Sequence, residues 1–414
     1  MMRRTAALLA VLALAVAGCG RQDESGSGWG SPRSSEAETG GGAGSSERSP
    51  GAKGSGEPGL SWSYDRILDG SAALGDMAVA SEDDIWAYGS RRRADGTGDP
   101  FLVRYDGKDW REQPLPEAIG TEVQAAALTA VGSGEVWLTD ATAGSTGGTR
   151  IVRWDGTRWS PLEPAPSERV EDIKAFGPDD VWVLTSEGRV QHWDGTRWTV
   201  MRVPADGLAS LDGTATDDLW AVGYRDTRTT DGPGESEYTQ PVAVHWDGRT
   251  WSRAETPEYH FPEPVPPEPG AWLDTVVALA EGDIRAYGTH SFNHGEVEDE
   301  PDDEAIRLRW DGERWAEQPQ APGRCAERIP VLSDDANGLF LHGNWYLTAD
   351  GTCQKIARSR LPNKDGVRST SRQSLWLKEL ARLPGTDEVI GVGHVQVNQS
   401  GNPMSKAVVV SLNR

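Results

Sequence analysis

His192-Trp193-Asp194-Gly195-Thr196-Arg197-Trp198 determines the fold class of this chain, because close copies of it recur along the sequence. Asp-Gly supplies the positive φ angles that a short hairpin needs, and the aromatic residues on both sides suit paired strands. Each copy therefore predicts a β-hairpin. Further copies begin at Arg104, Arg153, His245 and Arg309, and a degenerate copy surrounds Trp345, Asp350 and Gly351.

A second element precedes each hairpin and consists of an apolar strand, an acidic turn and another apolar strand. In the first copy, Ala78-Val79-Ala80 leads into Asp83-Asp84, and Ile85-Trp86-Ala87 follows. The other copies are Glu135–Trp137, Asp179–Trp182, Asp217–Trp220 and Asp283-Ile284, with weaker ones at Asp334–Phe340 and Asp387–Ile390. Four strands per unit, at a spacing of about 40 to 60 residues, are typical of a propeller blade, which cannot bury both faces alone. The pattern predicts an all-β fold, a seven-bladed β-propeller of four-stranded antiparallel blades.

The two ends of the chain complement each other. The seventh unit ends at Val408-Val409-Val410-Ser411-Leu412 without a Trp-containing strand after it, whereas Ser61-Trp62-Ser63-Tyr64 stands alone before the first unit. We therefore expect the N-terminal strand to complete the last blade, which removes the exposed edges of the ring. Six or eight blades are the alternatives to seven.

The hairpins resemble a shortened form of the Asp-box of sialidase-type propellers, in which an Asp and a Gly between the third and fourth strands precede a packed Trp. In architecture the chain also resembles the WD40 and kelch propellers, and it is similar to propeller lipoproteins of high-GC Gram-positive bacteria. The resemblance covers the propeller, and its motifs are structural. It implies a fold and no particular activity, because such propellers serve as hydrolases, lyases, chaperones and scaffolds alike.

The first residues are typical of an export signal. A charged start is followed by the apolar run 6–17, which has the length of a signal-peptide core rather than of a membrane span. The run ends at Val16-Ala17-Gly18-Cys19, which resembles the lipobox of bacterial lipoproteins. We expect residues 1–18 to be a signal peptide and lipid on Cys19 to hold the protein at the outer face of the cytoplasmic membrane. An ordinary secretory signal with an incidental cysteine is the alternative.

Residues 19–59 separate the lipidated cysteine from the propeller. They are rich in Gly, Ser, Glu, Arg and Pro, and they cannot bury enough apolar surface to offset chain entropy. We expect a disordered tether here, followed by one domain, the β-propeller, over residues 60–414. Arg3-Arg4 leaves the twin-arginine export route open beside general secretion, which the residues that follow favour.

The charge of the chain restricts its partners. The formal net charge is −23 and no basic stripe occurs. Nucleic acid binding and direct docking on anionic lipid are therefore disfavoured. We expect a monomer whose partners are the membrane, through the N-terminal lipid, and an envelope protein or glycan. Cys325 and Cys353 form an even pair in an exported chain, which predicts a disulfide rather than a metal site.

The aromatic and imidazole side chains of the repeat look functional but have a simpler explanation. The tryptophans recur in every unit, so we expect them to pack between blades rather than to stack on sugar rings. His192 and His245 look like general bases, yet they occupy the position that arginine fills in other units. We expect them to make a repeated polar contact, such as one to the acidic turn. The arginines are Arg104, Arg153 and Arg309.

Insertions collect in one class of loop. The turns of the Asp-Asp and Asp-Gly elements stay short, whereas loops between second and third strands and some connections between units are long. Both kinds of long loop lie on one face of a propeller, and insertions on one side of a repeat protein commonly mark its binding surface. We therefore predict the binding face there. The long segments are 91–99, 142–149, 226–240, 257–270, 291–304 and 395–406.

Two of these segments hold the candidate binding residues. The loop that contains Tyr259, Phe261 and several prolines either presents a stiff strip to a partner or only connects two blades. The acidic segment after His290 either offers oxygen and imidazole ligands to Ca²⁺ or a softer ion, or is a solvated loop. It lacks the residue order of a calcium loop, and no metal is identified. Its candidate residues are His290, His294, Glu296, Glu298, Asp299, Asp302 and Asp303.

No set of residues indicates a reaction. We find neither the Arg, Tyr and Glu group of sialidase chemistry, nor an isolated carboxylate pair, nor a nucleophile elbow, and we name no catalytic residue and no cofactor. Two functions remain open. We favour a non-catalytic recognition module for an envelope protein or glycan. The alternative is an exported carbohydrate-active hydrolase or lyase with its site in the central funnel, which would show carboxylates, or an Arg, Tyr and Glu group, converging in a deep pocket.

Overall fold

The computed structural model describes residues 59–414 except 94–96, 121–122, 124–125, 141–148, 167, 206, 230–235, 261–269, 292–301, 327, 335 and 402. The predicted signal peptide, Cys19 and nearly all of the tether lie outside the described residues. Within them, the regular structure is β-strand apart from one 3₁₀ turn, η1 (Gly323–Cys325), and the all-β prediction is confirmed. In this part of the chain no helix has the length and apolar character needed to cross a membrane.

Four of the sheets have four strands each, and in each sheet every strand pairs antiparallel with the strand before it. The first of these sheets consists of β2 (Ala72–Ser81), β3 (Asp84–Arg92), β4 (Gly98–Tyr105) and β5 (Trp110–Gln113). The second consists of β6 (Ala126–Ala130), β7 (Val136–Asp140), β8 (Arg150–Trp154) and β9 (Trp159–Pro161). The others are β10 (Val170–Gly177), β11 (Asp180–Thr185), β12 (Val190–Trp193), β13 (Trp198–Val200), and β22 (Pro330–Ser333), β23 (Leu339–Leu341), β24 (Trp345–Leu347), β25 (Cys353–Lys355). These sheets are the predicted four-stranded antiparallel blades.

One sheet is larger than predicted. Its eight strands are β14 (Gly207–Ala215), β15 (Asp218–Thr229), β16 (Ser236–Trp246), β17 (Trp251–Ala254), β18 (Gly270–Ala280), β19 (Asp283–Ser291), β20 (Glu304–Trp310) and β21 (Trp315–Glu317). A single parallel pair, Thr239 with Gly270, joins the first four strands to the last four. The prediction of seven separate sheets is therefore wrong here, because β15 and β16 extend far enough for β16 to meet β18. The described strands form six sheets, of which five are single blades.

The N-terminal strand completes the last sheet, as predicted. β1 (Ser61–Ile67) pairs antiparallel with β29 (Met404–Asn413), from Ser61 opposite Asn413 to Ile67 opposite Val408. β28 (Val389–Asn398) and β27 (Arg372–Arg382) follow inward, and the short β26 (Ala357–Arg358) adds a parallel edge to β1. The first and last strands of the propeller thus lie side by side.

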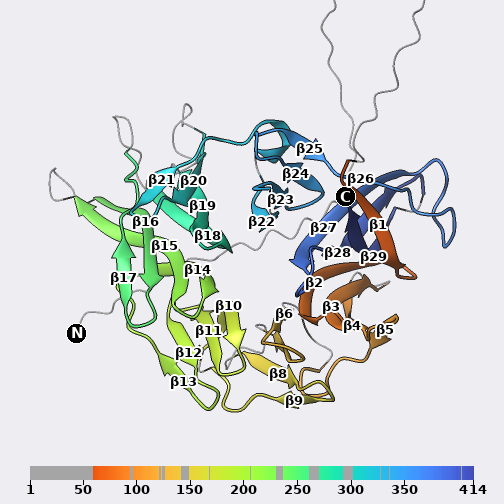
Figure 1. Ribbon diagram of the computed structural model, residues 1–414, viewed down its shortest axis with the longest axis horizontal. Helices are drawn as coiled ribbons and strands as arrows, with labels where there is room; N and C mark the ends of the chain where they lie inside the picture. Colours follow the sequence, from red (N-terminus) through yellow and green to blue (C-terminus); the bar gives the residue numbers. More distant parts are fainter. Residues whose placement is uncertain are drawn as a thin grey trace, which may run out of the picture. The chain divides into compact units, whose positions relative to one another are not determined.

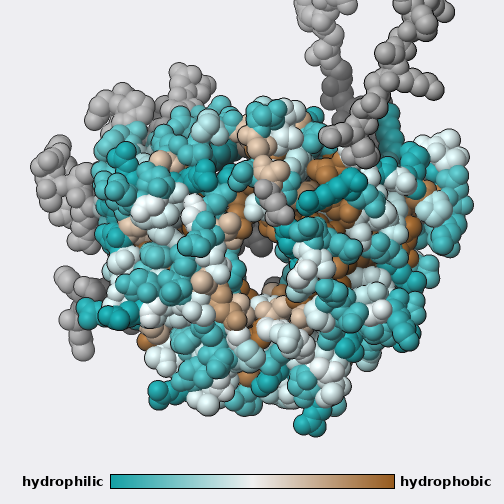
Figure 2. Space-filling model, viewed as in Figure 1, coloured by the Kyte–Doolittle hydropathy of each residue, from teal (hydrophilic) through white to brown (hydrophobic). Residues whose placement is uncertain are grey.

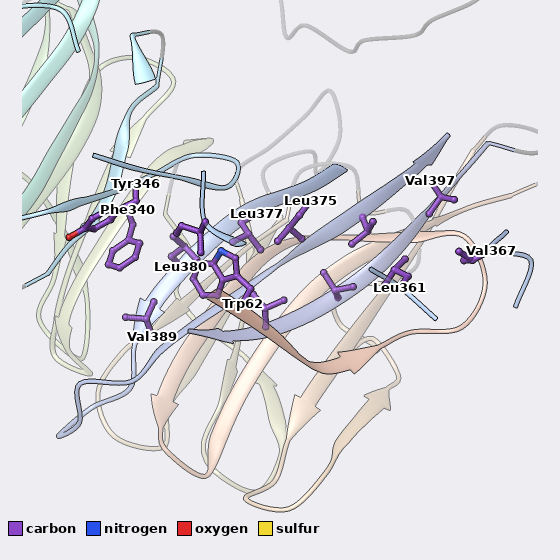
Figure 3. Packing of buried hydrophobic residues seen from close by; sticks show 14 residues of the cluster. Trp62, Phe340, Tyr346, Leu361, Val367, Leu375, Leu377, Leu380, Val389 and Val397 are labelled. Atoms are coloured by element: carbon purple, nitrogen blue, oxygen red, sulfur yellow. The ribbon is translucent and has the colours of Figure 1, made fainter. Parts of the chain in front are cut away.

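Trp62 anchors this closure. Its side chain is only 2% exposed and lies among the buried residues of the last sheet, near Leu377 and Leu380 of β27 (Figure 3). Its Nε1 atom donates a hydrogen bond of 2.8 Å to Oδ1 of Asn344, which lies just before β24. The N-terminal strand is therefore attached both to the last sheet and to the one before it.

The sheets follow one another around a central opening, and the first strand of each four-stranded group lies nearest to it (Figure 1). In space-filling form the middle of this face is hollow (Figure 2). Buried hydrophobic clusters fill the spaces between neighbouring sheets; one of them joins Leu74 of β2 to Val392 of β28. This arrangement is a β-propeller. The second-to-third strand loops and the connections between sheets share one end of the strands, which we call the loop face. The other turns form the turn face.

Candidate functional site

The two repeat histidines serve the propeller itself. His245 Nε2 on β16 lies 2.8 Å from Asp218 Oδ1 on β15, and Trp220 Nε1 donates to the same oxygen at 3.0 Å. The His245 ring stacks on Trp220 with 4.3 Å between ring centroids. His192 repeats these contacts with Asp180 and Trp182. The predicted polar contact with the acidic turn is confirmed.

Arginine makes the same contact in other units of the repeat. Arg104 Nε lies 2.7 Å from Asp84 Oδ1, and Arg153 lies 2.7 Å from Glu135. Arg309 lies 2.9 Å from Asp283 in the same way. Because histidine and arginine alternate at one structural position, the histidines carry no sign of a catalytic role.

The repeat tryptophans pack between neighbouring groups of strands. Trp220 is 2% exposed, and its ring centroid lies 4.8 Å from that of Trp310 and 5.2 Å from that of Trp315, both on the next hairpin. The prediction of packing between blades is confirmed. The equivalent contacts are Trp86 with Trp154 and Trp159, Trp137 with Trp193 and Trp198, and Trp182 with Trp246 and Trp251.

Carboxylates on the innermost strands tie adjacent sheets together. Asp76 on β2 accepts a hydrogen bond of 2.7 Å from the backbone N–H of Leu128 on β6. Asp172 on β10 accepts one of 2.8 Å from the N–H of Leu211 on β14 and one of 3.0 Å from the Ser210 hydroxyl. Burial raises the pKa of each of these two aspartates to about 6. These contacts between neighbouring units were not predicted, since nothing in the local repeat marks them.

Glu379 on β27 is a further inner-strand carboxyl group. Burial, together with the carboxylates of Asp76 and Asp212, raises its pKa to about 8, against a hydrogen bond from the Leu380 N–H that lowers it. The carboxyl group is therefore mostly protonated at neutral pH. A protonated carboxyl group on an inner strand matters for the enzyme alternative, because general acid catalysis requires one.

The loop face of the eight-stranded sheet brings together candidate residues from separate segments. The ring centroids of Tyr259, after β17, and His290, at the end of β19, lie 5.2 Å apart. His290 Nδ1 lies 3.2 Å from Oε2 of Glu304 at the start of β20. Tyr259, His290 and Glu304 therefore form one cluster, which we call the loop-face cluster.

Gln240 on β16 holds Tyr259 in place. The Tyr259 N–H donates to Gln240 Oε1 at 2.8 Å, and Gln240 Nε2 donates to the Tyr259 carbonyl at 2.7 Å. Burial, together with the carboxylates of Glu317 and Glu304, raises the pKa of the Tyr259 hydroxyl, so it stays protonated. Gln240 and Glu317 were not identified from the sequence as site residues, because only the folded arrangement of the strands brings them near Tyr259.

The other predicted site residues fall into three groups. Asp303 accepts a hydrogen bond of 2.6 Å from the Ser291 hydroxyl, and Asp302 is exposed. Cys325 and Cys353 form the predicted disulfide, with Cα atoms 5.9 Å apart. Cys19, Phe261, His294, Glu296, Glu298 and Asp299 lie outside the described residues.

Two further features matter for a site: groups of metal ligands and cavities. Among the described residues no group of three or more His, Cys, Asp or Glu side chains is placed to hold a metal ion. A cavity of about 1090 Å³ lies at the turn face of β14–β15 and β18–β19, away from the loop-face cluster. Its lining includes Asp218, Trp220 and His245, whose polar atoms already bind one another, so we assign these residues to the framework.

Comparisons with known proteins identify no family. No family model matches the chain. No curated protein matches it either. Among solved structures, YCF48 from Cyanidioschyzon merolae is 11% identical, with 85% of this chain and 98% of that chain covered and a TM-score of 0.45. The WD40 β-propeller domain of Doa1 is 8% identical, with 85% and 97% covered and a TM-score of 0.47.

The β-propeller domain of the Trilobed protease from Pyrococcus furiosus is similar in the same general way. It is 11% identical, 81% of this chain and 98% of that chain are covered, and the TM-score is 0.38. At such identities and TM-scores these likenesses carry no argument about function. The function is therefore argued from the contacts of this chain.

Proposed function

We propose that this protein is an extracytoplasmic lipoprotein whose β-propeller recognises an envelope protein or glycan through its loop face, without catalysing a reaction. The observation that carries the proposal is the loop-face cluster, in which Tyr259, after β17, meets His290 and Glu304, which lie opposite each other on β19 and β20. Loops that carry binding residues on a rigid scaffold are a common arrangement in recognition proteins.

The cluster has the properties of a preorganised contact surface. Gln240 is 2% exposed and fixes the backbone of Tyr259 through two hydrogen bonds. The side chain of Glu304 is 72% exposed, and that of His290 is 6% exposed. A partner would meet a half-buried aromatic ring and an exposed carboxylate that are already oriented, which lowers the entropy cost of binding.

The position of the protein in the cell is part of the same proposal. Cys19 follows a signal-like apolar run, and polar sequence begins directly after it. Lipid on this cysteine and the tether after it would leave the propeller beside the membrane and free to turn toward a partner.

We also infer a blade count from the sheets. The two halves of the eight-stranded sheet are each four antiparallel strands, and one residue pair joins them. We count them as two blades, which together with the five single-blade sheets makes seven. The count does not depend on the pairing of Thr239 with Gly270, because all other strand pairs lie within one half or the other.

One observation favours the enzyme alternative. Glu379, with a pKa raised to about 8, is electrostatically coupled to Asp76, and a carboxyl group kept neutral at physiological pH is what general acid catalysis requires. Against it, both oxygens of Asp76 are engaged by backbone N–H groups of Met77 and Leu128. We therefore favour a structural role for the inner carboxyl groups. Cleavage of envelope glycans that is lost in Glu379→Gln would reverse this preference.

The recognition proposal is tested with the soluble Cys19→Ser chain as bait for detergent-solubilised envelope proteins and glycans of the native cell. A double variant, Tyr259→Ala with Glu304→Gln, removes the exposed groups of the loop-face cluster and keeps the Gln240 contacts. The matched control is Glu313→Gln, which changes an exposed acid on a turn-face hairpin.

We expect a partner that the parent chain and the control retain and that the double variant loses. A partner held equally by all three would move the binding surface away from this cluster. If nothing specific is retained by the parent chain, recognition is the wrong function, and screening for glycan cleavage becomes the decisive assay.

A further inference from the structure

The repeat is broken where β18–β21 faces β22–β25. The second-strand position that holds Trp86, Trp137, Trp182 or Trp220 elsewhere is occupied by Arg285 on β19. On the facing sheet, Ala349 and Gln354 occupy the two hairpin positions beside the Asp-Gly turn where tryptophans stand in the regular copies. Three tryptophan rings fill each of four other contacts between groups of strands, and all three are missing from this one.

The missing rings leave a crevice between the two groups of strands. Its volume is about 490 Å³, and it is lined by residues of β19, β20, β23 and β24, including Tyr287 and Leu339. Pockets that bind small ligands usually measure about 300 to 1,000 Å³ and combine apolar walls with a few convergent polar groups. We call this cavity the arginine crevice.

The lining of the arginine crevice is positively charged although the chain as a whole is strongly acidic. Among the residues that the structure describes, the lining contains four arginines and one carboxylate, that of Asp283. Arg285 and Arg309 both pair with Asp283, at distances of 3.0 and 2.9 Å, so one carboxylate is shared by two guanidinium groups. The other two arginines are Arg307 and Arg328, whose hydrogen bonds to protein include the carbonyl oxygens of Ala326 and His342.

The polar groups of the crevice are held before any ligand arrives. Both Nε and Nη2 of Arg285 donate to Asp283, each at 3.0 Å, which fixes the plane of the guanidinium. Burial raises the pKa of the Tyr287 hydroxyl to about 12 in spite of Arg285 and Arg307, so this hydroxyl remains a hydrogen-bond donor. Fixed donors bind an anion at a lower entropy cost than mobile surface lysines.

The disulfide fixes one wall of the crevice. Cys325 is 1% exposed, lines the cavity and follows the connection from β21. Its bond to Cys353 attaches this connection to β25 of the facing sheet. The part of the wall that contains Cys325 is therefore held by a covalent bond rather than by tryptophan packing.

We propose that the arginine crevice binds a small ligand through an anionic group, a carboxylate or a phosphate, which the guanidinium groups of Arg285, Arg307 and Arg309 recognise. Planar guanidinium groups match both anions bidentately. The long-range field of the acidic chain opposes anions, so affinity must come from these short contacts. This site is separate from the loop-face cluster and does not depend on the recognition proposal.

The test measures binding of inorganic phosphate and of glucuronate to the Cys19→Ser chain by isothermal titration calorimetry at low and high salt. Arg285→Trp restores the residue of the regular repeat and fills the crevice. Arg307→Gln keeps the size of the side chain and removes its charge. Arg314→Gln is the control, because this arginine lies on the same hairpin as Arg309 but outside the crevice.

We expect saturable binding of at least one probe at one site, weakened about tenfold or more by Arg285→Trp and by Arg307→Gln and unchanged by Arg314→Gln. Binding of only one of the two probes tells carboxylate from phosphate recognition. If neither probe binds the parent chain, or if both crevice variants bind as the parent does, the proposal is wrong.

Circular dichroism and melting temperature establish that each variant folds. If Arg285→Trp fails to fold, the proposal is tested by Arg307→Gln and Arg314→Gln alone: the first should bind the probe more weakly than the parent, and the second should bind it equally well. The Tyr259→Ala, Glu304→Gln double variant should bind the probe as the parent does, which separates this site from the loop-face cluster.

Discussion

Single side chains in this protein mostly serve the framework, even where their chemistry resembles that of an active site. Asp218 accepts hydrogen bonds from a tryptophan N–H and faces His245, and other sheets place arginine where His245 stands. A buried carboxylate is stable only when its oxygens are paired, and the repeat supplies these pairs in every regular copy. A histidine beside a carboxylate is therefore weak evidence of catalysis when its position repeats around a ring.

Glu379 gives a pH dependence that can be measured. Its pKa is raised to about 8 in the folded chain, against about 4.3 for an ordinary glutamate, so the folded state binds the proton more tightly. The stabilisation is fully present below pH of about 4 and is lost as pH rises through about 8, with a slope of at most about 1.4 kcal/mol per pH unit. Glu379→Gln removes this titration.

We therefore expect the melting temperature of the parent chain to fall, relative to that of Glu379→Gln, as pH rises from about 5 to about 9. Thermal unfolding of both chains over this range measures it. Asp172 titrates in both chains, so the difference reports Glu379 together with its interaction with the Asp76 carboxylate. Melting curves that stay parallel at every pH would show that Glu379 titrates normally.

Among the strands, β1 closes the ring, and β15 and β16 make one part of the ring differ from the regular four-stranded blade. β1 lies between β26 and β29 in the last sheet and covers β29, which would otherwise expose a long edge to solvent. β15 and β16 are 12 and 11 residues long, and their extension joins two sheets that the repeat predicts as separate. The repeat predicts strand number well because hairpin turns are local, but strand length follows from packing.

Trp62→Ala tests the closure. It empties a buried site and leaves the Asn344 side chain without the 2.8 Å donor, so we expect a loss of about 3 to 5 kcal/mol in the free energy of unfolding. Chemical denaturation of both chains measures this loss. Trp376→Ala is the matched control, because Trp376 is 44% exposed and should cost far less. Equal costs at the two positions would mean that β1 does not hold the ring closed.

For the entire chain, the proposed function makes the lipid on Cys19 and the tether after it the elements that govern where the propeller can act. The chain carries a formal net charge of −23, so attraction to anionic lipid cannot hold it at a membrane. In the proposed function, attachment rests on Cys19. Since one lipidated residue would carry the anchoring, a single substitution should release the protein.

We expect Cys19→Ser to move the protein from the membrane fraction to the soluble extracytoplasmic fraction, and detergent phase partitioning measures the change. Ser46→Ala, in the same tether, should remain with the membrane. A Cys19→Ser chain that stays in the membrane fraction would mean that another element anchors it.

Local patterns were enough to predict the strand units, the hairpins, the pairing of the two chain ends, the disulfide and the buried tryptophans. Each of these depends on turn chemistry or on a period that neighbouring residues carry. The contact of His245 with Asp218 could be predicted as well, because comparison of the copies showed an interchangeable position. Even the arginine crevice left a trace, since Arg285 stands where the repeat has tryptophan.

Other features depend on how the sheets are set around the ring. The ties from Asp76 and Asp172, the joining of Thr239 to Gly270 and the meeting of Tyr259 with His290 all link separate strands. No local pattern specifies them, because they depend on the distances between packed sheets, which result from every side chain between those sheets at once. Local sequence patterns therefore predict the architecture. The candidate binding sites could not be predicted in this way, because they form only where the packed sheets bring separate segments together.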